Sequence, residues 1–378
     1  MTETTLSVTS SLESVGAGPW NRLAGEHPFL RYEFLETLHA TGCASRQTGW
    51  RPEYLLLRRG DELVGAMPLY LKSHSRGEYV FDQAWANAFE RNGLPYYPKL
   101  VCAVPFSPVT GPRLLAADHD DRVLLARAGA AIVSQLKVSS LHVLFPNQQD
   151  IEALKEAGYM LREGVQFHWE NAGFENFEQF LAAMSHDKRK KIRQDRRRVS
   201  DAGVRFRWLR GAQIDAASLD FFYRCYASTY ESHWSSPYLT PEFFQRIRAD
   251  MPDNMLLVIG DKDGAPVAAA LNMVGGDTMY GRYWGATEFV SGLHFETCYM
   301  QGIEYCIAHG LARFEGGAQG VHKMSRGLLP TATWSAHHVA DPRFASAIAE
   351  FLDSETAAMD DYLTELEAHT PFKRTSAP

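Results

Sequence analysis

The chain has 378 residues, and this length favours two domains over one. Its composition, 45% hydrophobic and 22% charged, is ordinary for a globular protein. The formal net charge of −7 excludes a protein that coats nucleic acid with its whole surface, so any anion-binding site must be local.

The five cysteines are scattered and include no CxxC pair, which indicates reduced thiols and excludes a disulfide framework. Residues 1–12 lack a basic start followed by an apolar core, so they do not resemble a secretory signal. No apolar stretch approaches the roughly 18 residues that a membrane span needs. We therefore expect a cytoplasmic protein without a membrane span.

The first half of the chain begins with a loose N-terminal segment, residues 1–26, followed by a domain over residues 27–170. Hydrophobic periodicity and Gly or Pro breaks define its elements. They are, in chain order, helix 32–41, strands 53–58 and 63–71, an irregular stretch 74–113, helix 120–136, strand 141–145, helix 151–157 and strand 159–169.

The second half repeats this scheme over residues 171–345, and a C-terminal helix and tail follow at 346–378. Its elements are helices 177–184 and 187–202, strand 204–209, helices 219–230 and 241–251, hairpin strands 255–260 and 267–274, strand 278–284, helix 294–309, a strand from 313 and a helix over 342–368. Each half has a helix pair, a β-hairpin, a helix and a strand. This weak internal duplication predicts an α/β fold with a mixed sheet in each half.

A dense basic run lies on the helix expected over 187–202. Residues 187–198 hold eight basic and two acidic side chains, a local charge of +6 in an acidic protein. One interpretation is capture of phosphates from a tRNA end, a nucleotide or a cofactor pyrophosphate. The other is a solvated helix face, as in most charge runs. The expected phosphate contacts are Lys188, Arg189, Arg193 and Arg197.

A glycine-rich loop after a strand carries the densest set of reactive side chains. Residues 315–327 contain Gly316, Gly317 and Gly320, whose backbone N–H groups can approach an anion. The spacing is not that of a Walker loop, and the simpler interpretation is a flexible turn. The candidate catalytic or binding side chains in this loop are Glu315, Gln319, His322, Lys323 and Arg326.

Two further clusters are candidates for substrate binding. Trp284, His294 and Glu296 run from a strand end into the first turn of a helix, although Glu296 can simply complement the helix dipole. The irregular stretch 74–113 can line a substrate groove or form a packed loop. Its candidate contacts are Trp85, Tyr96, Tyr97, Lys99 and Arg113.

Metal binding is not expected. The histidines show no ligand spacing beyond the adjacent His337 and His338. A site formed by His294, Glu296 and His322 would draw on separate segments and lack a fourth ligand.

Three segments resemble one family. LHFETCYMQGIEYCIAHGLARFEGGAQGVHKMSRGLLPTATWSAH, YYPKL and PFSPVTGPRLL are similar to the FemAB-like GNAT proteins, often labelled predicted N-acyltransferases or peptidoglycan biosynthesis or recognition proteins. The resemblance covers roughly residues 27–345. It implies two tandem GNAT-like domains packed side by side, each a mixed, mostly antiparallel sheet flanked by helices, with a groove between them.

The resemblance also implies a donor and a lysine. In characterised Fem transferases, an amino acid delivered on tRNA extends a peptidoglycan precursor. By similarity, Lys323 falls where those enzymes carry a lysine near the reacting ester, and the basic helix resembles their charged insertion. The acetyl-CoA loop [RQ]-x-x-G-x-[GA] is missing, since residues 287–293 offer only Gly292. This departure puts acetyl-CoA use in doubt.

We therefore expect an N-acyltransferase in which an amine attacks an activated acyl carbonyl. His322, Glu315 or His294 would be the general base. Lys323 and the backbone of residues 317–320 would stabilise the oxyanion. The donor would be acyl-CoA or aminoacyl-tRNA, no cofactor would be bound permanently, and the acceptor would be a small-molecule or peptide-like amine. The alternative is a non-catalytic module that binds a cell-wall fragment or another small ligand.

Overall fold

The computed structural model describes residues 3–231, 235–318 and 320–373, and the chain forms two compact units. The first unit comprises residues up to 164 together with 332–362, and the second unit comprises 165–331 together with the chain from 363 onward. Three elements have residues in both units: β9 (Met160–Glu170), β15 (Leu329–Val339) and α12 (Pro342–Ala368). The domain limits expected near residues 26, 170 and 345 stay a prediction.

The first unit contains two sheets. One has the strand order β1-β3-β4-β7 and is antiparallel. In the other, β15, β8, β6, β5 and β2 follow one another, with β6 and β8 parallel and the other pairs antiparallel. Its elements are β1 (Thr4–Thr9), α1 (Ala17–Ala24), α2 (Tyr32–Ala40), β2 (Trp50–Pro52), β3 (Tyr54–Arg59), β4 (Glu62–Met67), β5 (Leu69–Lys72), α3 (Gln83–Arg91), β6 (Lys99–Cys102), β7 (Leu115–Ala116), α4 (His119–Leu136), β8 (Ser140–Leu144) and α5 (Gln148–Glu156).

Helix α4 shows how the sequence fixes the core of this unit. The Asp118 carboxylate accepts a hydrogen bond from the backbone N–H of Asp121 and caps the helix start. Leu125 and Val133 face inward and share one buried cluster with Leu57 and other strand residues. The expected helix over 120–136 is therefore confirmed.

The N-terminal segment is not loose, which corrects one expectation. Strand β1 pairs along its whole length with β3, and α1 places Trp20 at 0% exposure, where its indole N–H donates to Leu30 O at 2.7 Å. Nearly all of β1 is exposed, so it lacks the apolar alternation that marks a half-buried strand. Trp20 and Ala24 are the two buried residues that anchor this short helix.

The stretch 74–113 is also more regular than expected, because it contains α3 and the four-residue strand β6. All four β6 residues are buried, so no alternation reveals the strand. The strand expected over 63–71 is two strands in different sheets, β4 and β5, which meet at Pro68. Proline has no backbone N–H to continue the hydrogen-bonded ladder.

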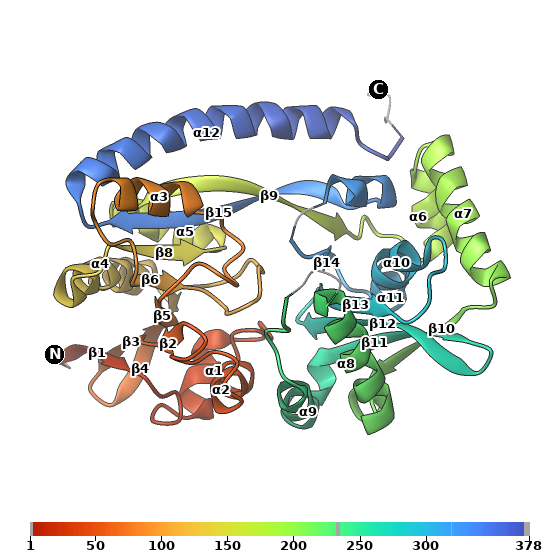
Figure 1. Cartoon of the computed structure of the whole chain (residues 1–378), viewed down its shortest axis with the longest axis horizontal. Helices are drawn as coiled ribbons and strands as arrows, with labels where there is room; N and C mark the ends of the chain where they lie inside the picture. The colour runs from red at the N-terminus through yellow and green to blue at the C-terminus, as the bar shows by residue number, and fades with distance from the viewer. Residues whose placement is uncertain (1–2, 232–234, 319, 374–378) are drawn as a thin grey trace. The chain divides into compact units, whose positions relative to one another are not determined.

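The second unit is built on the strand order β10-β11-β12-β13-β14-β9, with β13 and β14 parallel and the other pairs antiparallel. Figure 1 shows α8 and α9 on one side of these strands and α10 and α11 on the other. None of the described helices is long and apolar enough to cross a membrane. The elements are α6 (Phe177–Ala183), α7 (His186–Asp201), β10 (Arg205–Arg210), η1 (Gly211–Gln213), α8 (Ala216–Glu231), α9 (Pro241–Asp250), η2 (Pro252–Asn254), β11 (Met255–Lys262), β12 (Ala265–Gly275), β13 (Thr278–Ala286), α10 (Leu293–Phe295), η3 (Glu296–Met300), α11 (Gln301–Ala308), β14 (Arg313–Glu315) and η4 (Val321–Arg326).

Candidate active site

A small cavity lies where β13 and β14 stop pairing. The two parallel strands are in register only over Thr278–Tyr280 and Arg313–Glu315, whereas β13 continues to Ala286. The pairing of β12 with β13 also shifts, which leaves Arg282 as an extra, bulged residue. The cavity, which we call the notch, has a volume of about 80 Å³. Its lining includes Asn272, Gly281 to Trp284, His294, Cys298, Tyr299 and Gly316.

One wall of the notch is the helix expected over 294–309. It runs from Leu293 to Ala308 as α10, the π-helical turn η3 and α11, and we call it the notch helix. Gly292 precedes it with a φ of 90°, which a residue with a side chain rarely adopts. Single π-turns inside helices are often found at functional sites.

His294 packs into the notch as a neutral group. Its ring stacks on Trp284 with centroids 4.3 Å apart. Burial, together with the neighbouring His322, Lys323 and Arg326, lowers the pKa of His294 to about 4. At neutral pH this imidazole therefore carries no proton charge and has an acceptor nitrogen.

Lys323 is the buried cation beside the notch. Its side chain is 2% exposed, and Nζ donates hydrogen bonds to Gly317 O at 2.9 Å and Ala318 O at 3.1 Å. Burial lowers the pKa of Lys323 to about 8, although Cys298 opposes the shift. Most Lys323 side chains are thus charged at pH 7, and they lose this charge as the pH rises past about 8.

The glycines of this loop fit close packing. A Cβ on Gly316 would lie 2.5 Å from Leu328 Cδ2, and one on Gly317 would lie 3.2 Å from Gly281 O. The loop carbonyls at residues 317 and 318 point toward Lys323, so this part of the loop accepts hydrogen bonds instead of donating them. Gln319 lies outside the described residues.

His322 and Arg326 occupy the same 3₁₀ turn as Lys323, η4. The His322 ring is exposed, and its centroid lies 6.4 Å from that of His294. Burial, followed by the charges of Lys323 and Arg326, lowers the pKa of His322. Arg326 is 7% exposed, lies 4.0 Å over the Phe295 ring and donates to Asp195 Oδ2 at 3.1 Å. Arg326 therefore fastens the turn to α7.

Glu296 and Glu315 are buried at 4% exposure each, and Glu315 ends β14 beside the loop. Glu296 Oε1 accepts from Arg196 Nε at 3.1 Å and from Gln301 Nε2 at 2.8 Å. Burial raises the pKa of Glu296, while Arg196 opposes the shift. A buried, doubly hydrogen-bonded carboxylate does more than complement the helix dipole.

The basic run of α7 divides by partner. Lys191 and Arg198 pair with Asp195, and Arg193 pairs with Glu178. Lys188 and Arg197 are exposed and Arg189 is half-buried, and within the described residues none of these three has a carboxylate partner. The capture of phosphates by this helix stays a prediction.

The substrate contacts expected in the first half lie in the first unit and are largely buried. Lys99 and Arg113 are each 0% exposed. Lys99 contacts Glu78 and Asp82. The Arg113 guanidinium donates to Leu144 O at the end of β8, at 2.8 Å, and to two carbonyls of the stretch 74–113. Trp85 and Tyr96 are 5% exposed, whereas Tyr97 is half-buried. Burial of Arg113 speaks against its direct contact with a substrate.

Sequence reasoning missed Asn272, Cys298, Tyr299 and Asp195. Asn272 is 3% exposed within the otherwise apolar β12, and a lone amide in such a strand is a signal that could have identified it. The other three have no comparable signal. Among the described residues, no group of His, Cys, Asp and Glu is arranged to hold a metal ion.

Comparison with known proteins gives the family and the fold. The FemAB-like family model, described as peptidoglycan biosynthesis/recognition, matches residues 11–374, and no curated protein matches the sequence. FemX is similar with a TM-score of 0.53 and 12% identity over 84% of this chain and 94% of that one. The C-terminal domain of a lysylphosphatidylglycerol synthetase from Agrobacterium fabrum gives 0.54 and 9% over 89% and 95%.

L-PGS from Bacillus licheniformis gives a TM-score of 0.52 and 12% identity over 87% of this chain and 98% of that one. At these identities the likeness concerns the fold alone. The expected fold class is confirmed: an α/β chain of two tandem GNAT-like halves with mixed, mostly antiparallel strands flanked by helices. The first unit also has a separate sheet, β1-β3-β4-β7, that is wholly antiparallel.

Proposed function

The chain belongs to the FemAB-like family, and from this premise we propose that it is an N-acyltransferase whose reaction site is the notch. It moves an acyl or aminoacyl group from an activated donor to an amine. The observation that carries the proposal is Lys323, a buried cation with a pKa lowered to about 8, beside an imidazole that is neutral at pH 7. Perturbed titratable groups that converge on a cavity indicate a functional site.

In the proposed reaction, the amine nitrogen attacks the acyl carbonyl carbon and the carbonyl oxygen becomes an oxyanion. The Lys323 ammonium stabilises that charge. The attacking nitrogen loses its proton to a base, and the bond from the acyl carbon to the leaving oxygen or sulfur breaks. The leaving group takes up a proton. No covalent enzyme intermediate is needed.

His322 is the best-placed general base, because its ring is exposed and stays neutral at pH 7. His294 is a weaker base, since its pKa is about 4. We assign oxyanion stabilisation to Lys323 and not to the backbone of residues 317 and 318, whose carbonyls face the lysine.

The donor is an aminoacyl-tRNA or an acyl-CoA, and the acceptor is a peptide-like amine of the cell-wall type. One contact argues against the usual pyrophosphate anchor at the start of the notch helix. A Cβ on Gly292 would lie 3.4 Å from Asp195 O and 3.5 Å from Val199, so α7 packs against this helix start. The phosphates of such a donor must therefore bind at another place on the protein.

The test is a transfer assay with the full chain, an amine-bearing cell-wall peptide and either aminoacylated tRNA or acetyl-CoA, followed by mass spectrometry. Lys323→Met should lower the rate by about 10²–10³-fold, as expected for the loss of one oxyanion donor. Lys155→Ala, which removes an exposed lysine of α5, is the matched control and should leave the rate unchanged.

Product formation that survives Lys323→Met would remove the notch from the mechanism. Saturable peptide binding without turnover for either donor would favour the binding-module alternative.

A further inference from the structure

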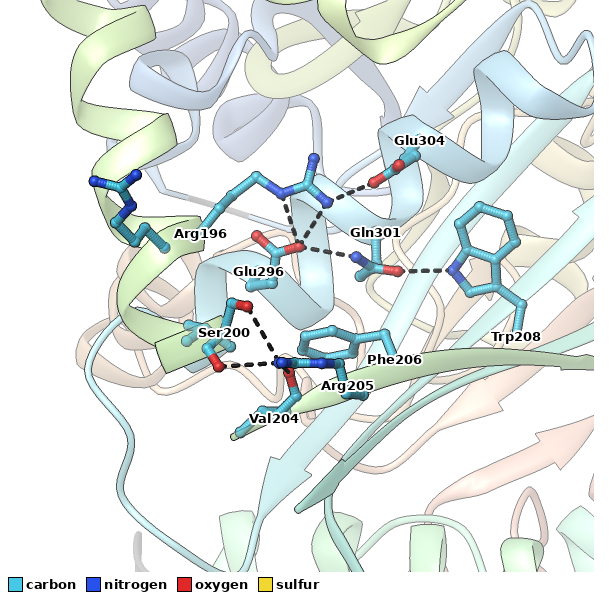
Figure 2. Close-up of a pocket in the computed structure, with 11 residues that line it drawn as sticks. Arg196, Ser200, Val204, Arg205, Phe206, Trp208, Glu296, Gln301 and Glu304 are labelled. Carbon is cyan, nitrogen blue, oxygen red and sulfur yellow. Dashed lines mark hydrogen bonds and ion pairs between the residues drawn. The ribbon is translucent and has the colours of Figure 1, made fainter. Parts of the chain in front are cut away.

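A second and larger cavity lies on another side of the notch helix. It has a volume of about 550 Å³, within the range of small-molecule sites. Figure 2 shows that α7, β10 and the notch helix contribute its lining. We call it the arginine groove and define it by Arg196, Arg197, Arg205, Phe206, Trp208 and Glu304. All of these residues belong to the second unit.

Two of the three arginines lack a carboxylate partner within the described residues. Arg196 is neutralised, because it lies 3.1 Å from Glu296 and 2.6 Å from Glu304. Arg197 and Arg205 are exposed and form no ion pair there. The rim of the groove therefore offers two guanidinium groups to an anion, and guanidinium groups bind phosphates well.

Arg205 is held in place without being neutralised. Its NH1 donates to Ser200 O at 2.9 Å, Ser200 Oγ at 3.1 Å and Val204 O at 2.9 Å. Figure 2 shows this guanidinium next to the end of α7. A positioned cation loses less side-chain entropy when it binds an anion.

Aromatic rings lie along the same strand. Trp208 is half-buried, its indole N–H donates to Gln301 Oε1 at 3.0 Å, and its ring packs edge-on against Tyr305 at 5.3 Å. Phe206 is half-buried two residues before it. At a strand rise of about 3.3 Å per residue, the Cα atoms of Arg205 and Trp208 are roughly 10 Å apart, and both residues line the groove. Cations at one end and fixed rings at the other suit a phosphate joined to a nucleobase.

We propose that the arginine groove binds a nucleoside phosphate, with the phosphate on Arg197 and Arg205 and the base against Trp208 and Phe206. The inference rests on the proposed function, because both candidate donors carry nucleoside phosphates: acyl-CoA in its adenosine phosphate, and aminoacyl-tRNA in the nucleotides next to its terminal adenosine. Glu304, with a side chain 35% exposed, is an acceptor for an exocyclic amino group of the base.

The notch helix sets the distance between nucleotide and reaction site. Glu296, Gln301 and Glu304 line the groove, whereas His294, Cys298 and Tyr299 line the notch. A helix with its side chains is about 10–12 Å wide. The nucleotide in the groove must therefore reach the reacting carbonyl through a spacer. The pantetheine arm of CoA is one such spacer. In an aminoacyl-tRNA the terminal adenosine carries the ester, so the groove would hold a nucleotide upstream of it and the terminal adenosine would be the spacer.

The test is calorimetric titration of the full chain with three probes: adenosine 3′-phosphate 5′-diphosphate, the trinucleotide CCA and inorganic phosphate. Arg197→Gln should weaken the nucleotide probes at least tenfold. Lys190→Gln, which removes an exposed α7 cation outside the groove, is the matched control and should change nothing. If a nucleotide probe quenches tryptophan fluorescence in the unchanged chain but not in Trp208→Phe, the base lies against Trp208.

Tighter binding of the CoA fragment than of CCA supports a CoA-type donor, and the reverse order supports an RNA end; either order upholds the inference. The inference is wrong if neither nucleotide binds saturably, or if Arg197→Gln and Lys190→Gln weaken nucleotide binding equally. The two proposals fail separately. If the groove is empty but transfer still depends on Lys323, only the inference falls, whereas nucleotide binding without transfer removes only the proposed function.

Discussion

Replacement of Lys99 by methionine should strongly destabilise the first unit, because Lys99 compensates two buried carboxylates. Its ammonium contacts Asp82, Glu78 Oε2 at 2.8 Å and Ser75 Oγ at 2.8 Å, and the side chain is 0% exposed. Methionine keeps an unbranched chain but removes the charge. Loss of one partner of a buried ion pair typically costs about 3–5 kcal/mol.

The structure indicates which of the two carboxylates the loss of the Lys99 charge destabilises most. Lys72 Nζ lies 4.0 Å from Glu78 Oε1, so a second cation remains near Glu78. Burial lowers the pKa of Lys72 to about 7, so this help fades as the pH rises above 7. Asp82 depends on Lys99 directly, and the pKa of Asp82 is held down mainly by Lys99 against the opposing effect of burial. Asp82→Asn added to Lys99→Met should therefore recover part of the loss.

Hydrogen exchange, read peptide by peptide, measures this loss in each unit separately. Peptides from β5 and β6 should lose about 3–5 kcal/mol of protection, while peptides from β12 and β13 in the second unit act as an internal control. A loss below about 1 kcal/mol in β6, the size of an ordinary mutational effect, would refute the reasoning. Lys99 would then be accessible in solution, and a substrate contact would be the better explanation of this lysine.

Three further outcomes are expected. Trp20→Ala should lower the free energy of unfolding, measured by urea titration, by about 3–5 kcal/mol, because the side chain is 0% exposed. A loss below about 1 kcal/mol would support the original interpretation of residues 1–26 as a loose segment. Gly285→Ala should lower the thermal midpoint, since its Cβ would lie 2.1 Å from Cys225 O, whereas Gly18→Ala meets open space and should not; equal midpoints would contradict the packing. The transfer rate should fall as the pH passes about 8, because Lys323 is charged below that pKa and neutral above it, and Lys323→Arg should remove this limb from the pH–rate profile. An unchanged limb in the arginine variant would assign it to another group.

Much of the fold could be predicted from the sequence where periodicity and helix ends are strong. Helix α4 and the hairpin of β11 and β12 are examples, since each combines an apolar pattern with a clear cap or turn. Strands β1 and β6 could not be predicted in the same way. One is almost wholly exposed and the other wholly buried, so neither shows the alternation that identifies a half-buried strand.

The candidate site was predicted as two clusters but not as one cavity. The segments that contain Trp284 and Lys323 are far apart in sequence, and only the parting of β13 and β14 forms the cavity between them. Local patterns do not encode such a long-range pairing. The sequence also could not show whether the loop donates or accepts hydrogen bonds at the site, because a glycine-rich sequence is compatible with either N–H groups or carbonyls facing it. The structure shows carbonyls facing Lys323.

The basic run shows that a high local charge indicates an anion-binding site only when the ion-pair partners of its side chains are also known. Asp195 is one of only two acids in residues 187–198, and its carboxylate pairs with Arg326 on the turn that carries Lys323. Neutralising the whole run would therefore both remove cations and loosen the turn, so a lost activity would not distinguish the two causes. A phosphate-binding test should change only the expected contacts that lack a carboxylate partner among the described residues, namely Lys188, Arg189 and Arg197. If these three substitutions leave tRNA binding and its salt dependence unchanged, α7 is a structural helix whose exposed charges are only solvated.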